Sequence, residues 1–448
     1  YRWSSVFSVT VTLLAILQLP NTAGTPTVEP KPKFDPLHRV EPQGKPRDVK
    51  LKVSFPAAWV AKYQVGPSGI RKLMWRKQMN TLSYAGSYGV ATDSSGNVFI
   101  TGETFGSIGG TNQGELDVWV AKYNPDGILI WIKQLGSSAV EKSYGVATDR
   151  SGNVFITGST VGSLGGNYKG QLDAWVAKFS PDGTLLWTKH LGTSTWDQSY
   201  GVATDSKGNV FITGITDGAL GGKHRGSYDA WVAKYSPDGT LVWIRQLGTS
   251  TWDESYAVAT DNSGNIFITG ETLGSLGSPS KGTYDAWVAK FNSAGTLKWK
   301  RQLGDVDHDF SLGVATDGSG NVLITGSTRG SLGSNNQGVE DAWVAKFTPD
   351  GTLRWLKQLG TSSADISNSV ATDSSGNVFI IGWTEGVLEG GISNRFTDTW
   401  VAKFSPDGKQ LWLRQDGARS YDEGKGIAVD VNGYVLTTGE TEGNFVRN

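Results

Sequence analysis

The chain contains no cysteine among its 448 residues. Disulfide bridges, thiolate metal sites and cysteine nucleophiles are therefore excluded. An excess of one charge sign is also missing, because 41 lysines and arginines nearly balance 42 aspartates and glutamates, which leaves a net charge of −1. Such a chain produces no strong field to attract nucleic acid or an anionic membrane surface. We therefore expect no nucleic-acid partner.

A mostly apolar run occurs at the N-terminus. Arg2 precedes this run of 14 residues, 6–19, and Pro20 and small residues up to Gly24 follow it. The pattern is typical of a secretory signal peptide cleaved near Gly24, and the run is too short to span a membrane comfortably. A retained anchor or a buried helix is the alternative. The sequence predicts a signal peptide at residues 1–24 and a protein that is secreted, periplasmic or at the cell surface, without a stable membrane span.

A proline-rich segment follows the apolar run. Residues 25–48 contain six prolines and several charges, and they show no apolar periodicity. Segments of this composition bury too little apolar surface to fold. We predict a disordered or extended linker at residues 25–50 and a folded domain at residues 51–448, which is long enough to bury a core without disulfides.

The dominant feature of the remaining sequence is a repeat. The segment Asp-Ala-Trp-Val-Ala-Lys-Phe recurs seven times with small changes, and four of the six gaps between copies are 56 residues long. A repeat of this length and regularity is typical of a propeller, a solenoid or an array. The repeated tryptophans are Trp59, Trp119, Trp175, Trp231, Trp287, Trp343 and Trp400.

Each repeat contains four short strands rich in β-branched and aromatic residues. Tight hairpin turns, such as residues 206–208 and 236–239, join the first strand to the second and the third to the fourth, whereas the other two connections are long. Alternate connections of an antiparallel meander lie on the same side, so both long connections share one face. Four antiparallel strands per unit predict a propeller blade. The strands of one unit are residues 201–205, 209–213, 230–235 and 240–246.

The two ends of the repeat region are complementary. The first copy supplies only a third strand near residues 58–63 and a fourth near 73–78, and the last copy only a first strand at 426–430 and a second at 434–438. A ring gains from this arrangement, because the two halves cover each other's exposed sheet edges, whereas a linear solenoid gains nothing. The sequence therefore predicts an all-β fold, a seven-bladed β-propeller of four-stranded antiparallel blades. One blade combines N-terminal strands three and four with C-terminal strands one and two.

The repeat also has a recognisable motif. The pattern Val-Ala-Thr-Asp-x-x-Gly-Asn-Val-Phe-Ile-Thr-Gly, followed by Asp-Ala-Trp-Val-Ala-Lys-Phe-x-Pro-Asp-Gly-Thr-Leu-x-Trp, resembles the seven-bladed β-propeller repeat family, often abbreviated SBBP. The resemblance covers residues 57–439, and the combined motif is quite specific. The Gly-His and Trp-Asp signature of WD40 blades is lacking. The resemblance implies the propeller fold, but this family has no single agreed activity to carry over.

Fourteen of the 18 tryptophans recur at the same positions in the third or fourth strand of every blade. Packing between neighbouring sheets explains such a recurrence, so we predict that these residues are core. Trp196 and Trp252 break the repeat, because each lies in a long inter-blade loop and precedes an aspartate, Asp197 or Asp253. Such a pair is able to stack on a sugar ring and accept its hydroxyl hydrogen bonds. The alternatives are an indole folded over neighbouring loops and a contact with a partner protein.

Three aspartates, Asp305, Asp307 and Asp309, form a closely spaced acidic cluster on one inter-blade loop. Carboxylates at alternate positions are able to bind calcium. The sixth and twelfth positions are Phe310 and Thr316, however, where an EF-hand needs glycine and glutamate. We therefore expect a solvated acidic loop and no cofactor, with calcium at this loop as the alternative.

Other polar residues are interpreted as structural. An aspartate precedes the third-strand tryptophan in six units, where it is able to accept hydrogen bonds from backbone amides; the alternative is a ring of acceptors that faces a ligand. Residues 93–97 and their copies are interpreted as turns. His190 replaces the glutamine found at equivalent positions, which suggests an exposed strand end. The six aspartates are Asp117, Asp173, Asp229, Asp285, Asp341 and Asp398.

No nucleophile elbow, phosphate loop, zinc-ligand pair or catalytic triad is found in the sequence, so we expect no enzyme and no catalytic residue. The loops vary between blades while the strands hardly do. We predict a monomeric, exported binding or scaffold module whose long-loop face recognises a protein or a cell-surface polysaccharide. A carbohydrate-binding module that uses Trp196 and Trp252 is the alternative. A propeller lyase or hydrolase with residues at the channel mouth is a third hypothesis.

Overall fold

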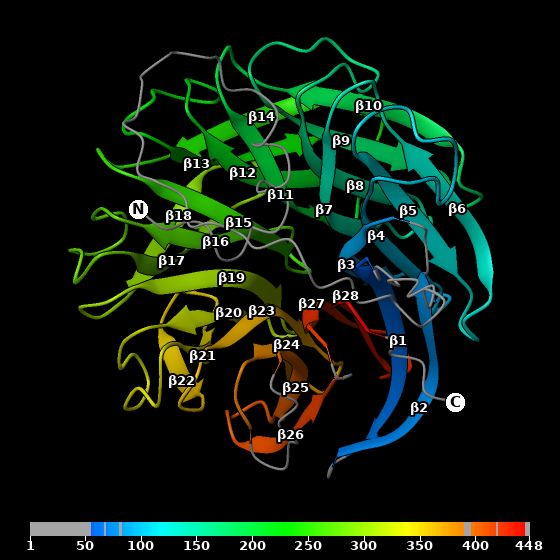
Figure 1. The fold of residues 1–448 in the computed structure, drawn as a ribbon. Helices are drawn as coiled ribbons and strands as arrows, with labels where there is room; N and C mark the ends of the chain where they lie inside the picture. The colour runs from blue at the N-terminus through cyan, green and yellow to red at the C-terminus, as the bar shows by residue number, and fades with distance from the viewer. Residues whose placement is uncertain (1–54, 67–68, 80–82, 389–395, 418–419, 444–448) are drawn as a thin grey trace, which may run out of the picture. The chain divides into compact units, whose positions relative to one another are not determined.

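The computed structural model describes residues 55–66, 69–79, 83–388, 396–417 and 420–443. The 28 elements in these residues are all β-strands, and they form seven four-stranded antiparallel sheets (Figure 1). No helix within these ranges is long and apolar enough to span a membrane. The predicted signal peptide, residues 1–24, and the predicted linker, residues 25–50, lie outside the described residues.

Six sheets are each built from four strands that are consecutive in the chain, and we number these blades 1 to 6. Blade 1 contains β3 (Ala85–Thr92), β4 (Val98–Thr104), β5 (Asp117–Tyr123) and β6 (Leu129–Leu135). Blade 2 contains β7 (Glu141–Thr148), β8 (Val154–Thr160), β9 (Asp173–Phe179) and β10 (Leu185–Leu191). Blade 3 contains β11 (Asp197–Thr204), β12 (Val210–Thr216), β13 (Asp229–Tyr235) and β14 (Leu241–Leu247).

Blades 4 to 6 continue the same pattern with little change in strand length. Blade 4 contains β15 (Asp253–Thr260), β16 (Ile266–Thr272), β17 (Asp285–Phe291) and β18 (Leu297–Leu303). Blade 5 contains β19 (Asp309–Thr316), β20 (Val322–Thr328), β21 (Asp341–Phe347) and β22 (Leu353–Leu359). Blade 6 contains β23 (Asp365–Thr372), β24 (Val378–Thr384), β25 (Asp398–Phe404) and β26 (Gln410–Asp416).

Blade 7 joins the two ends of the repeat region. It contains β27 (Asp422–Val429), β28 (Val435–Thr441), β1 (Ala57–Gly66) and β2 (Gly69–Met79), in the order β2-β1-β28-β27. Strands β1 and β28 pair antiparallel from Ala57 opposite Thr441 to Tyr63 opposite Val435. This pairing confirms the predicted closure of the ring by complementary half-blades.

The first strands of the seven blades surround a common axis (Figure 1). Each contacts the first strand of the next blade, and the series returns to its start because β27 contacts β3. The predicted seven-bladed propeller is therefore confirmed. The order of contact is β3, β7, β11, β15, β19, β23 and β27.

The two faces of the propeller differ in their connections. Tight hairpins such as residues 93–97 and 124–128 lie on one face, and the longer connections, such as residues 105–116 and the inter-blade link 136–140, lie on the other, which we call the long-loop face. Gly127 shows why the tight turns are strict. Its φ is +79°, and a side-chain Cβ there would lie 2.6 Å from the Trp75 ring of the preceding blade.

The repeated tryptophans divide into two groups. The third-strand tryptophans are fully buried between sheets; Trp231, for example, belongs to one cluster with Val176 of blade 2 and Val202 of blade 3. The prediction of core positions is confirmed for this group. It is confirmed only in part for the fourth-strand group: these side chains pack against the core clusters, but only Trp412 is buried within the described residues. The other side chains are half-buried because their indoles lie over the next blade's turn; Trp131 Nε1, for example, donates to the Pro181 carbonyl at 3.0 Å.

A buried pair of hydroxyl groups also joins neighbouring blades. Thr101 on β4 contacts Ser143 on β7 at 2.7 Å between the hydroxyl oxygens, and both side chains are fully buried. Because a hydroxyl group both donates and accepts, each pair satisfies polar atoms that burial would otherwise leave without a partner. Equivalent pairs are Thr157–Ser199, Thr213–Ser255, Thr269–Ser311, Thr325–Ser367 and Thr438–Ser87.

Candidate functional site

Each first strand contains a β-bulge that turns one side chain out of the regular pairing. In blade 1 the register with β4 shifts between Ser87 and Gly89, which leaves Tyr88 without a partner on the neighbouring strand. A bulge re-aims the side chain of the extra residue. The seven residues at this position, each partly exposed, form what we call the axial ring. They are Tyr88, Tyr144, Tyr200, Tyr256, Leu312, Asn368 and Lys425.

The four tyrosines of the axial ring contact one another in series. Ring centroids lie 5.9 Å apart for Tyr88 and Tyr144, 5.1 Å apart for Tyr144 and Tyr200, and 5.5 Å apart for Tyr200 and Tyr256. These distances are typical of tilted and edge-to-face aromatic pairs. Blades 1 to 4 therefore present a continuous aromatic surface at the axis.

Five glutamates lie next to the axial ring on its long-loop side. They occupy either the position two residues before the bulge or the facing position near the end of the second strand. In blades 4 and 7 both positions are glutamate, so that Glu254 faces Glu271 and Glu423 faces Glu440. The fifth is Glu103 of blade 1. Like charges directly opposite each other destabilise a sheet, so each pair needs a proton or a cation.

The glutamates of blades 7 and 1 have cations from the chain itself. Lys425 of the axial ring forms an ion pair with Glu423, and the positive charge of Lys425 also lowers the pKa of Glu440 against the larger effect of burial, which raises it. Burial raises the pKa of Glu103 to about 7, and Lys142 opposes this shift. Tyrosine hydroxyls complete the cluster: Tyr88 donates to Glu103 Oε1 at 3.1 Å.

The glutamate pair of blade 4 has no such cation. The Tyr256 hydroxyl oxygen lies 2.5 Å from Glu254 Oε2 and 2.8 Å from Glu271 Oε1. Glu271 is fully buried, and its Oε2 atom accepts no hydrogen bond. Burial raises the pKa of Glu254 to about 7, and burial together with the negative charge of Glu254 raises that of Glu271 well above its usual range. Among the described residues, no lysine or arginine forms an ion pair with either carboxylate.

Blades 5 and 6 contribute apolar groups to the same level of the axis. Phe310 precedes the bulge residue Leu312 by two positions on β19, and both are partly buried. In blade 6, Ile366 faces Trp383 across β23 and β24. The axial ring, the five glutamates, Phe310, Ile366 and Trp383 together form what we call the axial layer. This layer is aromatic over blades 1 to 4, contains glutamates in blades 1, 4 and 7, and is mainly apolar over blades 5 and 6.

The predicted Trp-Asp pairs are placed on the long-loop face, but their members differ in exposure. Trp196 is 44% exposed, and its Nε1 donates to Gln171. Trp252 is only partly exposed and packs on the Tyr228 ring at 4.8 Å between centroids. Asp197 and Asp253 are fully buried.

Both buried aspartates have structural partners within the loops. Asp197 Oδ2 accepts a hydrogen bond from the Thr193 amide at 2.6 Å, and its Oδ1 accepts one from the Thr216 hydroxyl at 2.5 Å. Asp253 accepts the same pair of bonds from Thr249 and Thr272. In each pair the aspartate therefore holds the loop in place. Of the two indoles, only that of Trp196 is exposed enough to contact a ligand.

The acidic loop of blade 5 is folded around its own backbone. Asp309 Oδ2 accepts the Asp305 amide at 2.8 Å, and Asp305 Oδ1 accepts the Asp307 amide at 2.9 Å. Asp309 is fully buried, and burial raises its pKa to about 7, whereas Asp307 is exposed. Across the described ranges there is no group of three or more His, Asp or Glu side chains that could hold a metal ion.

The aspartates that precede the third-strand tryptophans accept hydrogen bonds as predicted. Asp117 Oδ2, for example, accepts the Gln113 amide at 2.9 Å and the Gln134 side-chain amide at 2.8 Å. The interpretation of residues 93–97 as a turn is also confirmed, because Asp93 Oδ1 accepts the amides of Ser95 and Asn97 at 2.9 Å. These carboxylates therefore have a structural role.

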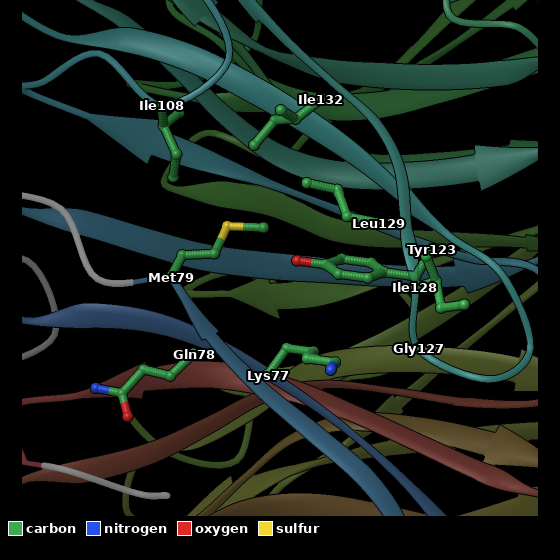
Figure 2. Close-up of a pocket in the computed structure, with 9 residues that line it drawn as sticks. All are labelled: Lys77, Gln78, Met79, Ile108, Tyr123, Gly127, Ile128, Leu129 and Ile132. Atoms are coloured by element: carbon green, nitrogen blue, oxygen red, sulfur yellow. The ribbon is translucent and has the colours of Figure 1, made fainter.

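A hollow of about 530 Å³ lies apart from these residues, on the outer side of the ring between β2 and β6 (Figure 2). Its lining is mainly apolar and includes Met79, Ile108, Tyr123 and Ile132. None of the predicted site residues lines it.

The axial layer was not among the predicted sites, although the sequence contains a signal for it. Strand positions hardly change between blades, yet the position after the first-strand serine or glycine is Tyr, Leu, Asn or Lys. This position and the position two residues before it vary between blades, whereas the Val-Ala-Thr that ends the strand hardly does, and such variation indicates side chains that the fold itself does not require.

Known proteins place the chain in a family. The seven sheets and the closed ring define a seven-bladed β-propeller. A family model described as a β-propeller repeat, SBBP, matches more than half of the chain, and the chain belongs to this family. The matched segments are residues 75–109, 130–165, 186–222, 242–277, 298–333, 354–389 and 411–445.

Curated relatives are distant and longer. The chain is 20% identical over 506 residues to an uncharacterized WD repeat-containing protein of Acanthamoeba polyphaga mimivirus, with 83% of this chain and 36% of that protein covered. It is 25% identical over 276 residues to the regulatory protein FlaEY of Caulobacter vibrioides, with 56% and 28% covered. The chain thus spans about a third of the length of these relatives.

Two solved structures are similar to the chain at low sequence identity. Sqt1 from Chaetomium thermophilum is 9% identical, with a TM-score of 0.43 over 80% of this chain and 97% of that one. A protein of unknown function from Bacteroides caccae is 12% identical, with a TM-score of 0.39 over 70% of this chain and 97% of that one.

Proposed function

We propose that this propeller is an exported, monomeric binding or scaffold module that recognises a partner protein through the axial layer on its long-loop face. The observation that carries the proposal is the contrast within the repeat. The Thr–Ser pairs, the third-strand tryptophans and the turn aspartates recur from blade to blade because the fold uses them. The axial ring instead contains four tyrosines, a leucine, an asparagine and a lysine, a mixture that suits recognition of one particular surface.

The composition of the axial layer favours a protein as partner. Tyrosine is enriched at protein interfaces, because it combines a large apolar area with a polar tip. Buried glutamates beside such tyrosines provide charge complementarity, which selects between partners. We propose binding and no catalytic step at this layer.

Site-specific photo-crosslinking tests this proposal. A benzophenone amino acid is placed at the exposed Trp196 on the long-loop face or, as the control, at the exposed Asp238 in a tight turn on the opposite face. Each protein is irradiated with the envelope and secreted fractions of the cells that produce it. We expect a discrete protein adduct from position 196 and none from position 238. Adducts of equal yield from both positions, or no protein adduct from position 196, would contradict the proposal.

A carbohydrate-binding module remains the second candidate, because the Trp196 indole is exposed on the same face. Exposed indoles stack on the apolar faces of sugar rings, but the adjacent carboxylate of Asp197 is already occupied. A glycan array that compares the wild type with Trp196→Ala tests this candidate. Glycan signal that disappears in the variant supports it, and the absence of such signal removes it.

A further inference from the structure

We propose that the Glu254–Glu271 pair, together with Tyr200 and Tyr256 of the axial ring, is a subsite for a lysine or arginine side chain of the partner. This inference rests on the proposed function, because it names the chemistry that the long-loop face recognises. Three features of blade 4 and its neighbours carry it: an excess of acceptors, an internal comparison with blade 7, and the aromatic surface beside the pair.

The acceptors of blade 4 outnumber its donors. Two carboxylates approach the same Tyr256 hydroxyl, at 2.5 and 2.8 Å, but a hydroxyl group has one proton and donates it to one acceptor at a time. Glu271 is fully buried, and its Oε2 atom has no hydrogen-bond partner at all. A buried carboxylate oxygen in this state has a high free-energy cost. The pair therefore requires either a bound proton or an added cation.

Blade 7 shows how the same arrangement is neutralised elsewhere in the chain. Glu423 and Glu440 face each other at the same register as Glu254 and Glu271. There the axial-ring residue is Lys425, which forms an ion pair with Glu423. In blade 4 the axial-ring residue is Tyr256 instead. A basic side chain from a partner would take the place that Lys425 occupies in blade 7.

The bound arrangement removes the competition for the Tyr256 hydroxyl. The incoming cation pairs with Glu254, which is 5% exposed, and the Tyr256 hydroxyl is then free to donate to Glu271. The rings of Tyr200 and Tyr256, 5.5 Å apart and partly exposed, offer π faces to the cation. Phe310 and Leu312 of the next blade provide an apolar surface for the residue that precedes or follows the basic one.

The charged and titratable groups around the pair do not supply the cation that it lacks. Asp253 lies next to Glu254 in the chain, and the negative charge of Glu340 acts on Glu271. Both add negative charge. The nearby cation Arg329 is instead engaged with Glu340 at 3.6 Å. The chain therefore supplies no cation to the blade 4 pair, and a bound proton or a cation from outside must neutralise it.

The test uses Nα-acetyl-arginine amide as the probe and the citrulline derivative as its neutral control, measured by calorimetric titration of the full chain. Two variants alter the subsite in different ways. The double variant Glu254→Gln/Glu271→Gln removes its charge, and Tyr256→Lys supplies an internal cation equivalent to Lys425 of blade 7. Glu115→Gln, at an exposed position, is the matched control. Thermal melting establishes that every variant is folded.

We expect the wild type and Glu115→Gln to bind the arginine derivative at least about ten-fold more tightly than the citrulline derivative, and both subsite variants to lose this preference. The inference is overturned if the wild type shows no saturable binding of the arginine derivative, or if either folded subsite variant keeps the preference. Failure here is distinguishable from failure of the proposed function. If the protein adduct at position 196 persists in Tyr256→Lys, the long-loop face still binds its partner, and only the cation subsite is rejected.

Discussion

Ile381 of blade 6 lies against Gly424 of blade 7 at the place where the six other blade interfaces have a Thr–Ser hydroxyl pair. A Cβ added to Gly424 would lie 2.6 Å from Ile381 Cγ1. The two departures from the repeat are therefore complementary: the larger apolar side chain occupies the space that the missing serine leaves. At this interface the chain exchanges a buried hydrogen bond for apolar packing.

This complementarity predicts strong coupling between the two positions. Gly424→Ser alone should destabilise the fold by about 1 to 3 kcal/mol, because it overpacks the space occupied by Ile381. Ile381→Thr/Gly424→Ser restores the Thr–Ser pair and should recover most of that loss. Urea denaturation of the two single variants and the double variant measures the coupling free energy. Additive effects would show that the two side chains do not meet.

The two classes of tryptophan should respond differently to truncation. Trp231 is fully buried and its Nε1 donates to the Ile215 carbonyl at 2.9 Å, so Trp231→Ala should cost about 3 to 5 kcal/mol of unfolding free energy. Trp196→Ala, at an indole that is 44% exposed, should change stability by less than about 1 kcal/mol. Denaturation curves of the two variants check this difference. A comparable loss for Trp196→Ala would place its indole in the core.

The axial glutamates should make stability depend on pH. Burial raises the pKa of Glu103 in the folded chain from 4.5 to about 7. The folded state therefore binds more protons than the unfolded state between these values, so unfolding free energy falls as the pH rises from about 4.5 to 7. Glu103→Gln should reduce this fall, because glutamine does not ionise and still accepts the Tyr88 hydrogen bond.

The comparison is made by measuring melting temperatures at pH 5 and pH 8 for the wild type, Glu103→Gln and the exposed-site control Glu115→Gln. We expect the drop between the two pH values to be smaller in Glu103→Gln and unchanged in the control. An equal drop in all three proteins would mean that Glu103 titrates normally in the folded chain.

The parts of the fold that recur could be predicted from the sequence. Strand alternation, turn residues and complementary ends were sufficient for seven blades and for ring closure. The axial ring could not be predicted in the same way, because a β-bulge interrupts the alternation that assigns side chains to faces. The sequence shows that the position of Tyr88 and Lys425 varies between blades, but it does not show that these side chains lie at the axis.

The burial of individual polar side chains also could not be predicted from the sequence. The prediction that His190 lies at an exposed strand end is wrong: its side chain is 3% exposed, with Nδ1 3.8 Å from Asp173 Oδ2 and Nε2 3.2 Å from the Leu164 carbonyl oxygen. It occupies the place where Gln134 of blade 1 donates to Asp117. A sequence shows that one residue replaces another, but the contact that both make depends on how the long loop folds over the strand end.

The axial layer exists as one site only if a single chain closes its own ring, and an engineered disulfide tests this most directly. The chain has no cysteine, so Ala57→Cys/Thr441→Cys introduces one unique pair at register partners on β1 and β28. Oxidation at low protein concentration should give a monomeric, crosslinked species on a non-reducing gel, with unfolding free energy raised by about 3 to 5 kcal/mol. Free thiols after oxidation, or disulfide-linked dimers in place of the crosslinked monomer, would contradict closure within one chain.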